Sequence, residues 1–390
     1  MNEVVLNDIC ELIVDCPHST AYDEGTGYPL VRTPNIGRGR IIYSGMHRVC
    51  EEVYNKRNAR AIPQTNDLIF AREATAGNVA LIQEGEKVCL GQRTVLIRPN
   101  ANLVNPAFLT YHLLAPEQQY KLLSTANGAT VAHVNMPTIR NLKLSLPPLA
   151  TQHRIANILS RYDSLIENYQ KQIKLLEEAA QRLYKEWFVD LHFPGHENTK
   201  IVDGVPEGWE KKKLVDMVDV QYGYAFDGKM FNSNSEGMPI LRIRNIPDGI
   251  TSDYTSEEAQ DCYIVHNGDI VVAMDGIFHI NSWSGGDAYL VQRACSFRPK
   301  EECMKGFIFQ AIQEPIKFFE KTLVGATVAH LGKKHIDSIE LCIPKNFELY
   351  QPFSKFYNQR QGLLSQIRLL TEARDRLIPK LISGLIVVNS

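Results

Sequence analysis

Short runs rich in apolar and β-branched residues fill most of the first 146 residues, and turns rich in Gly, Asn and Pro separate them. Such runs predict β-strands, which we expect over residues 4–13, 68–70, 79–82 and 95–97. A helical spacing of apolar residues replaces these runs over 106–123 and again, in the second half, over 305–323. The pattern predicts an α+β fold with two mostly β domains, each interrupted by one helix.

A much longer helical pattern starts after Pro147-Pro148, where we expect Thr151 to cap the first turn. Apolar residues recur every seven positions in two rows over 33 residues, 155–187, which corresponds to about 50 Å of helix. This regularity predicts a long helix with a continuous apolar seam. The rows are Ile155, Tyr162, Tyr169, Leu176 and Leu183, and then Leu159, Ile166, Ile173, Ala180 and Trp187.

A second stretch near the C-terminus repeats this pattern less regularly. Pro352 and Pro379 limit its expected regular part to 353–378. Either stripe could pack only against its own domain, but each helix is too long for one small domain to cover. We therefore expect the two helices to pair, antiparallel because whole domains connect them. The second rows are Leu349, Phe356, Leu363, Leu370 and Leu377, and then Phe353, Arg360, Ile367, Arg374 and Leu381, with two arginines.

The chain is an internal duplication. The hexapeptide GATVAH occurs at 128–133 and at 325–330, an offset of 325 − 128 = 197 residues. Two further echoes, of Gln92-Arg93 with Gln292-Arg293 and of Asn35-Ile36 with Asn245-Ile246, have similar offsets. Each half is therefore one module, and we expect the protein to bind something that itself has two related parts.

The composition limits the class of protein but does not indicate a function. The 390 residues are 44% hydrophobic and 22% charged, which is typical of a globular protein long enough for two domains. A net charge of −2 gives no global electrostatic argument for nucleic acid. Eight cysteines without a CxxC pair are expected to be buried free thiols. With no leader peptide and no run of eighteen apolar residues, we expect no membrane association and a cytoplasmic location.

The usual catalytic and metal-binding patterns do not occur. The stretch 325–334 has the wrong glycine spacing for a phosphate-binding loop, and Gly37-Arg38-Gly39 lacks the third glycine of a dinucleotide site. No HExxH is present, and His192 and His196 flank Pro194-Gly195, which interrupts a helix between them. No Asn-Pro-Pro-aromatic or Asp-Pro-Pro-aromatic tetrapeptide for amino methylation occurs either. We therefore expect no catalytic site and no metal site.

Three stretches suggest a family. They are LPPL…Q…RIA at 146–156, RLYKEWFVD…FPG at 182–195 and VPEGWE at 205–210. Together they closely resemble the DNA specificity subunit of type I restriction-modification systems. Two departures concern the ends of the modules: no Pro-x-Gly-Trp opens the first half, and Ile343-Pro344-Lys-Asn-Phe replaces Pro-Pro…Gln before the second helix.

The resemblance implies an order of parts: a target-recognition domain at 1–148, a central conserved helix at 149–195, a second target-recognition domain at 196–346, and a C-terminal helix and tail at 347–390. It also implies a non-catalytic subunit that reads a bipartite double-stranded DNA site, with the helix pair as a ruler between half-sites. Two methyltransferase subunits and translocase-nuclease subunits would be its partners. S-adenosylmethionine, ATP and magnesium would belong to those partners.

The duplication separates two kinds of DNA-binding candidate. Residues that both halves share cannot distinguish two half-sites, so Arg93 and Arg293, or His133 and His330, suit fold, phosphate or partner contacts better. Thr130 and Thr327 belong with them. Stretches that differ, 72–78 against 274–281 and 38–40 against 244–248, must carry specificity. The candidates are Arg32, Asn35, Arg38, Arg40, Arg72, Thr75, Asn78, Arg93, Arg242, Arg244, Asn245, Asp275, His279, Asn281, Arg293, Lys333 and Lys334.

Several alternatives stay open at this point. The arginines could instead pair with neighbouring carboxylates, and GATVAH could be a turn fixed by Gly and Thr. The whole chain could be a duplicated adaptor for proteins or glycans, whereas the missing motifs disfavour a self-sufficient nuclease or methyltransferase.

The residues expected at the helix pair or its partner interface are Tyr162, Ile166, Tyr169, Ile173, Leu176, Leu183, Trp187, Phe356, Leu363, Ile367, Leu370 and Leu377.

Overall fold

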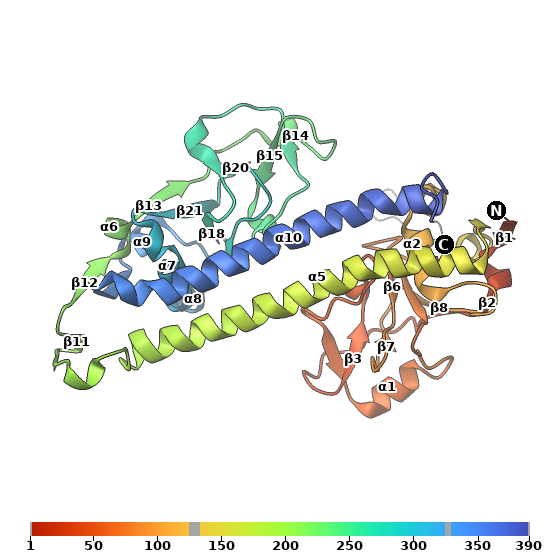
Figure 1. Ribbon diagram of the computed structural model, residues 1–390, viewed down its shortest axis with the longest axis horizontal. Helices are drawn as coiled ribbons and strands as arrows, with labels where there is room; N and C mark the ends of the chain where they lie inside the picture. The colour runs from red at the N-terminus through yellow and green to blue at the C-terminus, as the bar shows by residue number, and fades with distance from the viewer. Residues whose placement is uncertain (1, 125–132, 324–328, 389–390) are drawn as a thin grey trace. The chain divides into compact units, whose positions relative to one another are not determined.

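A computed structural model describes residues 2–124, 133–323 and 329–388 (Figure 1). The chain divides into two compact units, of which unit 1 comprises Met1–Glu167 with Leu370–Ser390 and unit 2 comprises Asn168–Leu369. Each of the two long helices is therefore shared between the units. Both GATVAH copies fall largely outside the described residues, together with Thr130 and Thr327.

Unit 1 is built on an antiparallel four-stranded sheet in the order β2-β8-β5-β6. A three-stranded sheet, β4-β3-β7, and the pair β1-β9 complete it. Its strands are β1 (Asn2–Val5), β2 (Cys10–Asp15), β3 (Tyr28–Val31), β4 (His47–Val49), β5 (Leu68–Ala71), β6 (Val79–Leu81), β7 (Cys89–Leu90), β8 (Thr94–Pro99) and β9 (Lys143–Leu146). Its short helices are α1 (Glu51–Arg57) and α4 (Met136–Arg140).

Unit 2 repeats this arrangement. Its four-stranded sheet has the order β13-β21-β18-β19, and the parallel pair β15-β20 matches the parallel pair β3-β7 of unit 1. The predicted internal repeat is therefore confirmed in the topology. The strands are β10 (Ile201–Val202), β11 (Val205–Pro206), β12 (Trp209–Lys213), β13 (Val218–Tyr222), β14 (Phe231–Asn232), β15 (Met238–Leu241), β16 (Tyr254–Thr255), β17 (Ile264–Val265), β18 (Ile270–Ala273), β19 (Ile280–Ser282), β20 (Ala288–Leu290), β21 (Ala294–Pro299) and β22 (Glu340–Pro344), with the short helices α6 (Leu214–Met217) and α9 (Lys333–Asp337).

Three predicted elements were wrong in detail. The strand expected over 4–13 is broken by a 3-10 turn, Leu6–Ile9, whose first and last side chains are buried in the core. The helix expected over 106–123 divides into α2 (Pro106–Leu114) and α3 (Pro116–Leu123), because Pro116 forces Ala115 into an extended conformation. The helix expected over 305–323 likewise divides into α7 (Lys305–Ala311) and α8 (Gln313–Thr322), since Pro315 cannot donate a hydrogen bond to Ala311.

The first long helix, α5, runs over Leu149–Tyr184 and continues in a π-helical turn, Lys185–Val189. Thr151 lies inside its first turn and does not cap it, because the helix begins directly after Pro148. Gln152 fastens this start to unit 1. Its side-chain amide donates to the Pro147 carbonyl (2.9 Å) and accepts from the Asn105 backbone (2.9 Å).

The second long helix, α10, runs over Gln351–Ile382 and is longer than the predicted 353–378. Pro352 is tolerated because the first turn of a helix needs no backbone donor. Pro379 lies one turn before the end, where it removes a single helical hydrogen bond. The two prolines therefore lie within the first and last turns of the helix, and these turns belong to it although the sequence predicted a shorter helix.

Segments of the two helices pair antiparallel within each unit. In unit 1, Ile155 and Leu159 of α5 share the core with Ile378 and Leu381 of α10. In unit 2, Glu177 of α5 contacts Arg360, while Trp187, in the π-helical turn after α5, contacts Phe353, earlier in α10. In the first row of α5, Ile155 is buried and the residues from Tyr162 to Leu183 are half-buried. In the second row, every residue from Leu159 to Ala180 is buried. On α10 the predicted positions are half-buried, namely Phe356, Leu363, Ile367, Leu370 and Leu377, while their neighbours Tyr357 and Ile378 are buried.

Candidate nucleic-acid interface

A cluster of three charged or polar side chains lies beside β5 in unit 1. The Nε of Arg93 donates to Oε2 of Glu73 (2.9 Å), and Nδ1 of His133 lies 2.6 Å from Oε1 of the same carboxylate. The Arg93 side chain is 61% exposed although its carboxylate partner is largely covered. Glu73 thus holds two side chains from distant parts of the chain and leaves the guanidinium at the surface.

The same cluster recurs in unit 2. Arg293 donates to Oδ2 of Asp275 (2.6 Å), and Nδ1 of His330 lies 2.5 Å from Oδ1. Its arginine is also 61% exposed. We call these two groups, Arg93–Glu73–His133 and Arg293–Asp275–His330, the Arg–acid–His clusters.

The local backbone explains why the clusters coincide. Arg93 and Arg293 both have left-handed backbones, with φ of 64° and 74°. Their carbonyls accept hydrogen bonds from Arg72 (2.9 Å) and Met274 (2.8 Å), which come directly after β5 and β18. The chain that follows each GATVAH copy then bonds back to the same residues, through Val134 to Arg72 (3.0 Å) and Leu331 to Met274 (2.7 Å). The duplicated hexapeptide therefore leads into the cluster in both units.

One residue distinguishes the two clusters. Arg72 is buried and donates to the Val134 carbonyl (2.9 Å) and to Asp15 (2.7 Å), and its NH2 lies 2.9 Å from Nε2 of His133. Because an arginine only donates, Nε2 of His133 accepts and its proton is on Nδ1, toward Glu73. Met274 takes the place of Arg72 in unit 2 and cannot make this bond. Arg72 therefore supports the first cluster from inside the domain, and its donors are not presented to a ligand.

Other sequence candidates also serve the fold. Asn35 is buried and Asn245 plays the same part, since each accepts a hydrogen bond from the backbone of the arginine three residues earlier. Thr75 donates to the Thr33 carbonyl (2.8 Å), Asn78 to the Ile36 carbonyl (3.0 Å) and Asn281 to the Ile246 carbonyl (2.8 Å). These side chains fix loops within each unit.

Two candidates of unit 1 face the long helices. Arg40 pairs with Glu167 of α5 (2.5 Å), and Arg38 donates to the Leu114 carbonyl (3.2 Å) while its own carbonyl accepts from Arg374 (3.5 Å). The first is therefore an anchor for α5. Arg38 is exposed.

The remaining candidates lie nearer the surface. Arg32 donates to the Gly45 carbonyl (3.0 Å), and the guanidinium of Arg242 lies 5.2 Å from the centre of the Phe231 ring. Arg244 is exposed and forms a bidentate pair with Asp253. The last three candidates are half-buried or exposed and lie close to the second cluster in sequence: His279, Lys333 and Lys334.

Comparisons with known proteins agree with this duplicated arrangement. The type I restriction modification DNA specificity domain family matches residues 1–178 and 206–367. The chain belongs to this family. Both Arg–acid–His clusters lie inside the matched ranges, and the predicted family is confirmed while the adaptor alternative gains no support.

Relatives of this specificity family match most of the chain. The type I restriction enzyme MjaIX specificity subunit of Methanocaldococcus jannaschii is 25% identical over 97% of this chain and 92% of its own. The MjaVIII specificity subunit of the same organism is 29% identical over 74% of this chain and 70% of its own. A crystal structure of a type I restriction-modification S subunit from M. genitalium, 16% identical, covers 97% of this chain and 95% of that chain with a TM-score of 0.53. This last likeness supports the fold.

The specificity chain also exposes apolar surface on its long helices. In unit 2 a shallow groove runs between α5 and α10, and Leu175 is exposed beside it. The groove residues are Gln172, Leu175, Leu176, Gln359, Gly362, Leu363 and Gln366. Because polar glutamines border an apolar floor, the groove has the character of a protein-docking surface.

The thiols and possible metal ligands complete the chemical inventory. All eight cysteines are free, as predicted, but Cys50 and Cys262 are exposed and not buried. Burial raises the pKa of the Cys10 thiol to about 12, so this sulfur is an unreactive thiol. Across the described ranges, no group of three or more His, Cys, Asp or Glu side chains is arranged to hold a metal ion. The same part of the chain has no helix with the length and apolarity to cross a membrane.

The sequence predicted one acidic member of the clusters, Asp275, but not the other, since Glu73 stood only within a stretch that differs between the halves. Two carboxylates of α5 that pair with arginines of α10, Asp163 and Glu177, were not predicted. A signal existed for the last two, because arginines that interrupt an apolar seam need carboxylate partners nearby. Nothing comparable in the sequence links Glu73 to Arg93 and His133.

Proposed function

We propose that this chain is the specificity subunit of a type I restriction-modification complex and that each unit reads one half of a bipartite DNA site. The observation that carries the proposal is the repetition of one Arg–acid–His cluster at equivalent backbone positions in two units. A duplex presents phosphates at regular intervals, so two equivalent cationic points suit two segments of the same duplex.

Arg93 and Arg293 are the proposed phosphate contacts of the two units. Each is exposed, oriented by a carboxylate, and shared by both halves, which suits a contact that carries no base information. Lys333 and Lys334 on α9 are further phosphate contacts in unit 2, since both are exposed. The carboxylate in each cluster limits the rotamers of the arginine, so less entropy is lost when a phosphate binds.

Base reading then falls to exposed residues that differ between the units. Arg38 in unit 1 and Arg244 in unit 2 are the candidates, because both are exposed, whereas Arg72 is buried and Asn281 bonds to the Ile246 carbonyl; the half-buried His279 is a further candidate in unit 2. Arginine pairs with guanine in the major groove, and each such contact contributes about 1 to 3 kcal/mol of discrimination.

The long helices are the proposed ruler between half-sites. α5 has 36 residues, or about 54 Å at 1.5 Å per residue, which exceeds one DNA turn of about 34 to 36 Å. Modules attached along such a helix could read successive major grooves of one duplex.

The partners would be methyltransferase subunits, in two copies, and translocase-nuclease subunits. The apolar groove between α5 and α10 is a proposed docking surface for a methyltransferase subunit. S-adenosylmethionine, ATP and magnesium would then belong to these partners, and recognition would be the task of this chain.

A methylation assay with the co-expressed methyltransferase tests the proposal. We expect specific methylation of a bipartite site by the complex. Arg93→Ala and Arg293→Ala should each weaken DNA binding for every sequence and lower the slope of log K against log salt by about 0.9.

Arg182→Ala is the matched control, because this exposed arginine belongs to neither cluster and pairs with Glu178 of its own helix. It should leave the salt slope unchanged. Binding to glycans or proteins with no affinity for DNA would overturn the proposal, as would a change of target bases caused by Arg93→Ala alone.

A further inference from the structure

Two arginines on α10 occupy positions in the apolar seam, and each is buried against a carboxylate of α5. In unit 1, NH1 of Arg374 donates to Oδ1 of Asp163 (2.6 Å), with side chains 9% and 2% exposed. Asp163 also accepts from the Tyr111 hydroxyl (2.5 Å). Burial by itself would lower the pKa of Arg374, but the attraction and hydrogen bonds of Asp163 and of the neighbouring Asp375 together outweigh it, and the net shift is upward.

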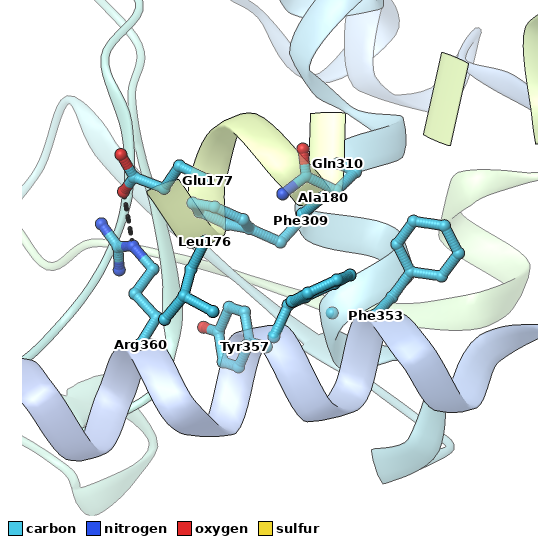
Figure 2. Close-up of a pocket in the computed structure, with 10 residues that line it drawn as sticks. Leu176, Glu177, Ala180, Phe309, Gln310, Phe353, Tyr357 and Arg360 are labelled. Atoms are coloured by element: carbon cyan, nitrogen blue, oxygen red, sulfur yellow. Dashed lines mark hydrogen bonds and ion pairs between the residues drawn. The ribbon is translucent and has the colours of Figure 1, made fainter. Parts of the chain in front are cut away.

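Unit 2 contains the second pair, Arg360 with Glu177 (2.6 Å), as Figure 2 shows. NH2 of Arg360 donates to the Asn281 side chain (2.8 Å), and another nitrogen donates to the Ser282 hydroxyl. The guanidinium also lies 5.4 Å from the centre of the Phe309 ring. Its charge is therefore surrounded by one carboxylate from α5 and by polar and aromatic partners from the rest of unit 2.

The two pairs have the same polarity. Both carboxylates are on α5 and both arginines are on α10, although the pairs lie in different units. The seam rows of α5, at 155–183 and 159–187, contain no Lys or Arg, and those of α10, at 349–377 and 353–381, contain no Asp or Glu. A duplication from one ancestral helix would not by itself produce this division of charge.

We infer that these two ion pairs make the first-half and second-half helices select each other and disfavour pairing with the like helix of a second copy of this chain. Two α5 helices would place Asp163 and Glu177 against seam rows that contain no cation. Two α10 helices would bury Arg360 without a carboxylate partner and would leave Arg374 only Asp375 of its own helix. Both arrangements leave unpaired charge in a desolvated seam, which is strongly unfavourable.

Which helices associate is independent of DNA recognition, so helix selection can be absent while the DNA-binding function stands, and the reverse. A seam made only of apolar residues would stabilise the intended pair but would accept any similar helix. Charges on the exposed faces of the helices contribute little to the selection of a partner helix, because water screens them.

A charge-swap cycle in the full chain gives the first test. Arg360→Glu places two carboxylates together and should lower the Tm by about 10 °C. Adding Glu177→Arg should restore more than half of that loss. The matched control combines Glu177→Arg with Arg374→Glu, which has the same net charge but joins residues that are not partners, and it should be less stable than either single variant.

Exchange between copies gives the second test. A full-chain variant with Asp163→Asn, Glu177→Gln, Arg360→Met and Arg374→Met keeps the seam without its charges. When two tagged copies are co-expressed, the variant should capture about tenfold more of the second copy than the wild-type chain does. Equal capture by both would overturn the inference, and so would equal rescue by the partner and non-partner swaps.

Discussion

The Arg–acid–His clusters show what sequence can establish about single residues and what it cannot. Arg93 and His133 were identified as shared with the second half, because both halves carry them at similar offsets. Their common partner Glu73 was not, since contact between residues 73, 93 and 133 depends on strand pairing. Arg72 was predicted to read DNA, yet it is buried and its hydrogen bonds are internal. The identity of a residue in a turn-like stretch does not reveal which way its side chain points.

His112 in α2 leads to a pH prediction. Burial lowers the pKa of this histidine from 6.5 to about 4. The unfolded chain therefore takes up a proton below about pH 6.5 while the folded chain does not, so stability present above that pH is lost as pH falls toward 4. The free energy of unfolding that this histidine contributes above pH 6.5, and that is lost by about pH 4, is about 3 kcal/mol. Urea unfolding at about pH 7.5 and about pH 4.5 measures it.

Substitution separates His112 from other acid-sensitive groups. His112→Leu should remove most of this part of the pH dependence, whereas His153→Gln, at an exposed position on α5, should keep it. Unchanged pH dependence in His112→Leu would contradict the assignment.

At the scale of elements, periodicity predicted more than turn signals did. The seam of α5 was correct from Leu159 to Ala180 because a buried helix face needs an apolar residue about every turn. Proline was not a consistent signal for a helix end: the chain leaves the helical conformation just before Pro116, whereas Pro352 lies within a helix. Its effect depends on whether the lost backbone donor had a partner, which local sequence does not show.

The seam also supports a stability prediction. Ile166→Asp should destabilise unit 1 by about 3 to 5 kcal/mol, because it buries a carboxylate without a cation. Lys171→Ala, at an exposed position of the same helix, should change stability by less than about 0.5 kcal/mol. Thermal unfolding and recruitment of the methyltransferase subunit measure both effects. Equal behaviour of the two variants would exclude a buried seam at this position.

At the scale of the whole molecule, the boundary between units falls inside both long helices and not at their ends. The predicted division at 148, 195 and 346 describes the sequence repeats and stays a prediction. Composition and motifs could not place the structural boundary, because a continuous helix shows no change of pattern there. It emerges from which domain covers each stretch of helix.

This boundary sets the design of a spacer experiment. Residues just after α5 belong to unit 2, where Phe193 packs against Trp209, so an insertion at 191–198 should leave the DNA spacer unchanged. Four residues inserted after Glu167 and also after Leu369 should lengthen the preferred spacer by one or two base pairs, since they add about 6 Å of helix.

Methylome sequencing of cells that carry each variant measures spacer length and half-site sequence together. Both half-sites should stay the same in the double insertion. A spacer that does not move there, or one that moves with the insertion at 191–198, would contradict the ruler.

The composition of unit 1 has a consequence for biosynthesis. Its core contains Ile378, Leu381 and Ile382, which follow the whole of unit 2 in the chain. During translation, unit 2 has all of its residues before unit 1 receives its last helical segment. Unit 1 thus starts before unit 2 and is completed after it. A premature stop after residue 369 would spare unit 2 and expose the core of unit 1 to proteases and chaperones, so the loss of residues 370–390 would be detected through a domain whose other residues precede unit 2.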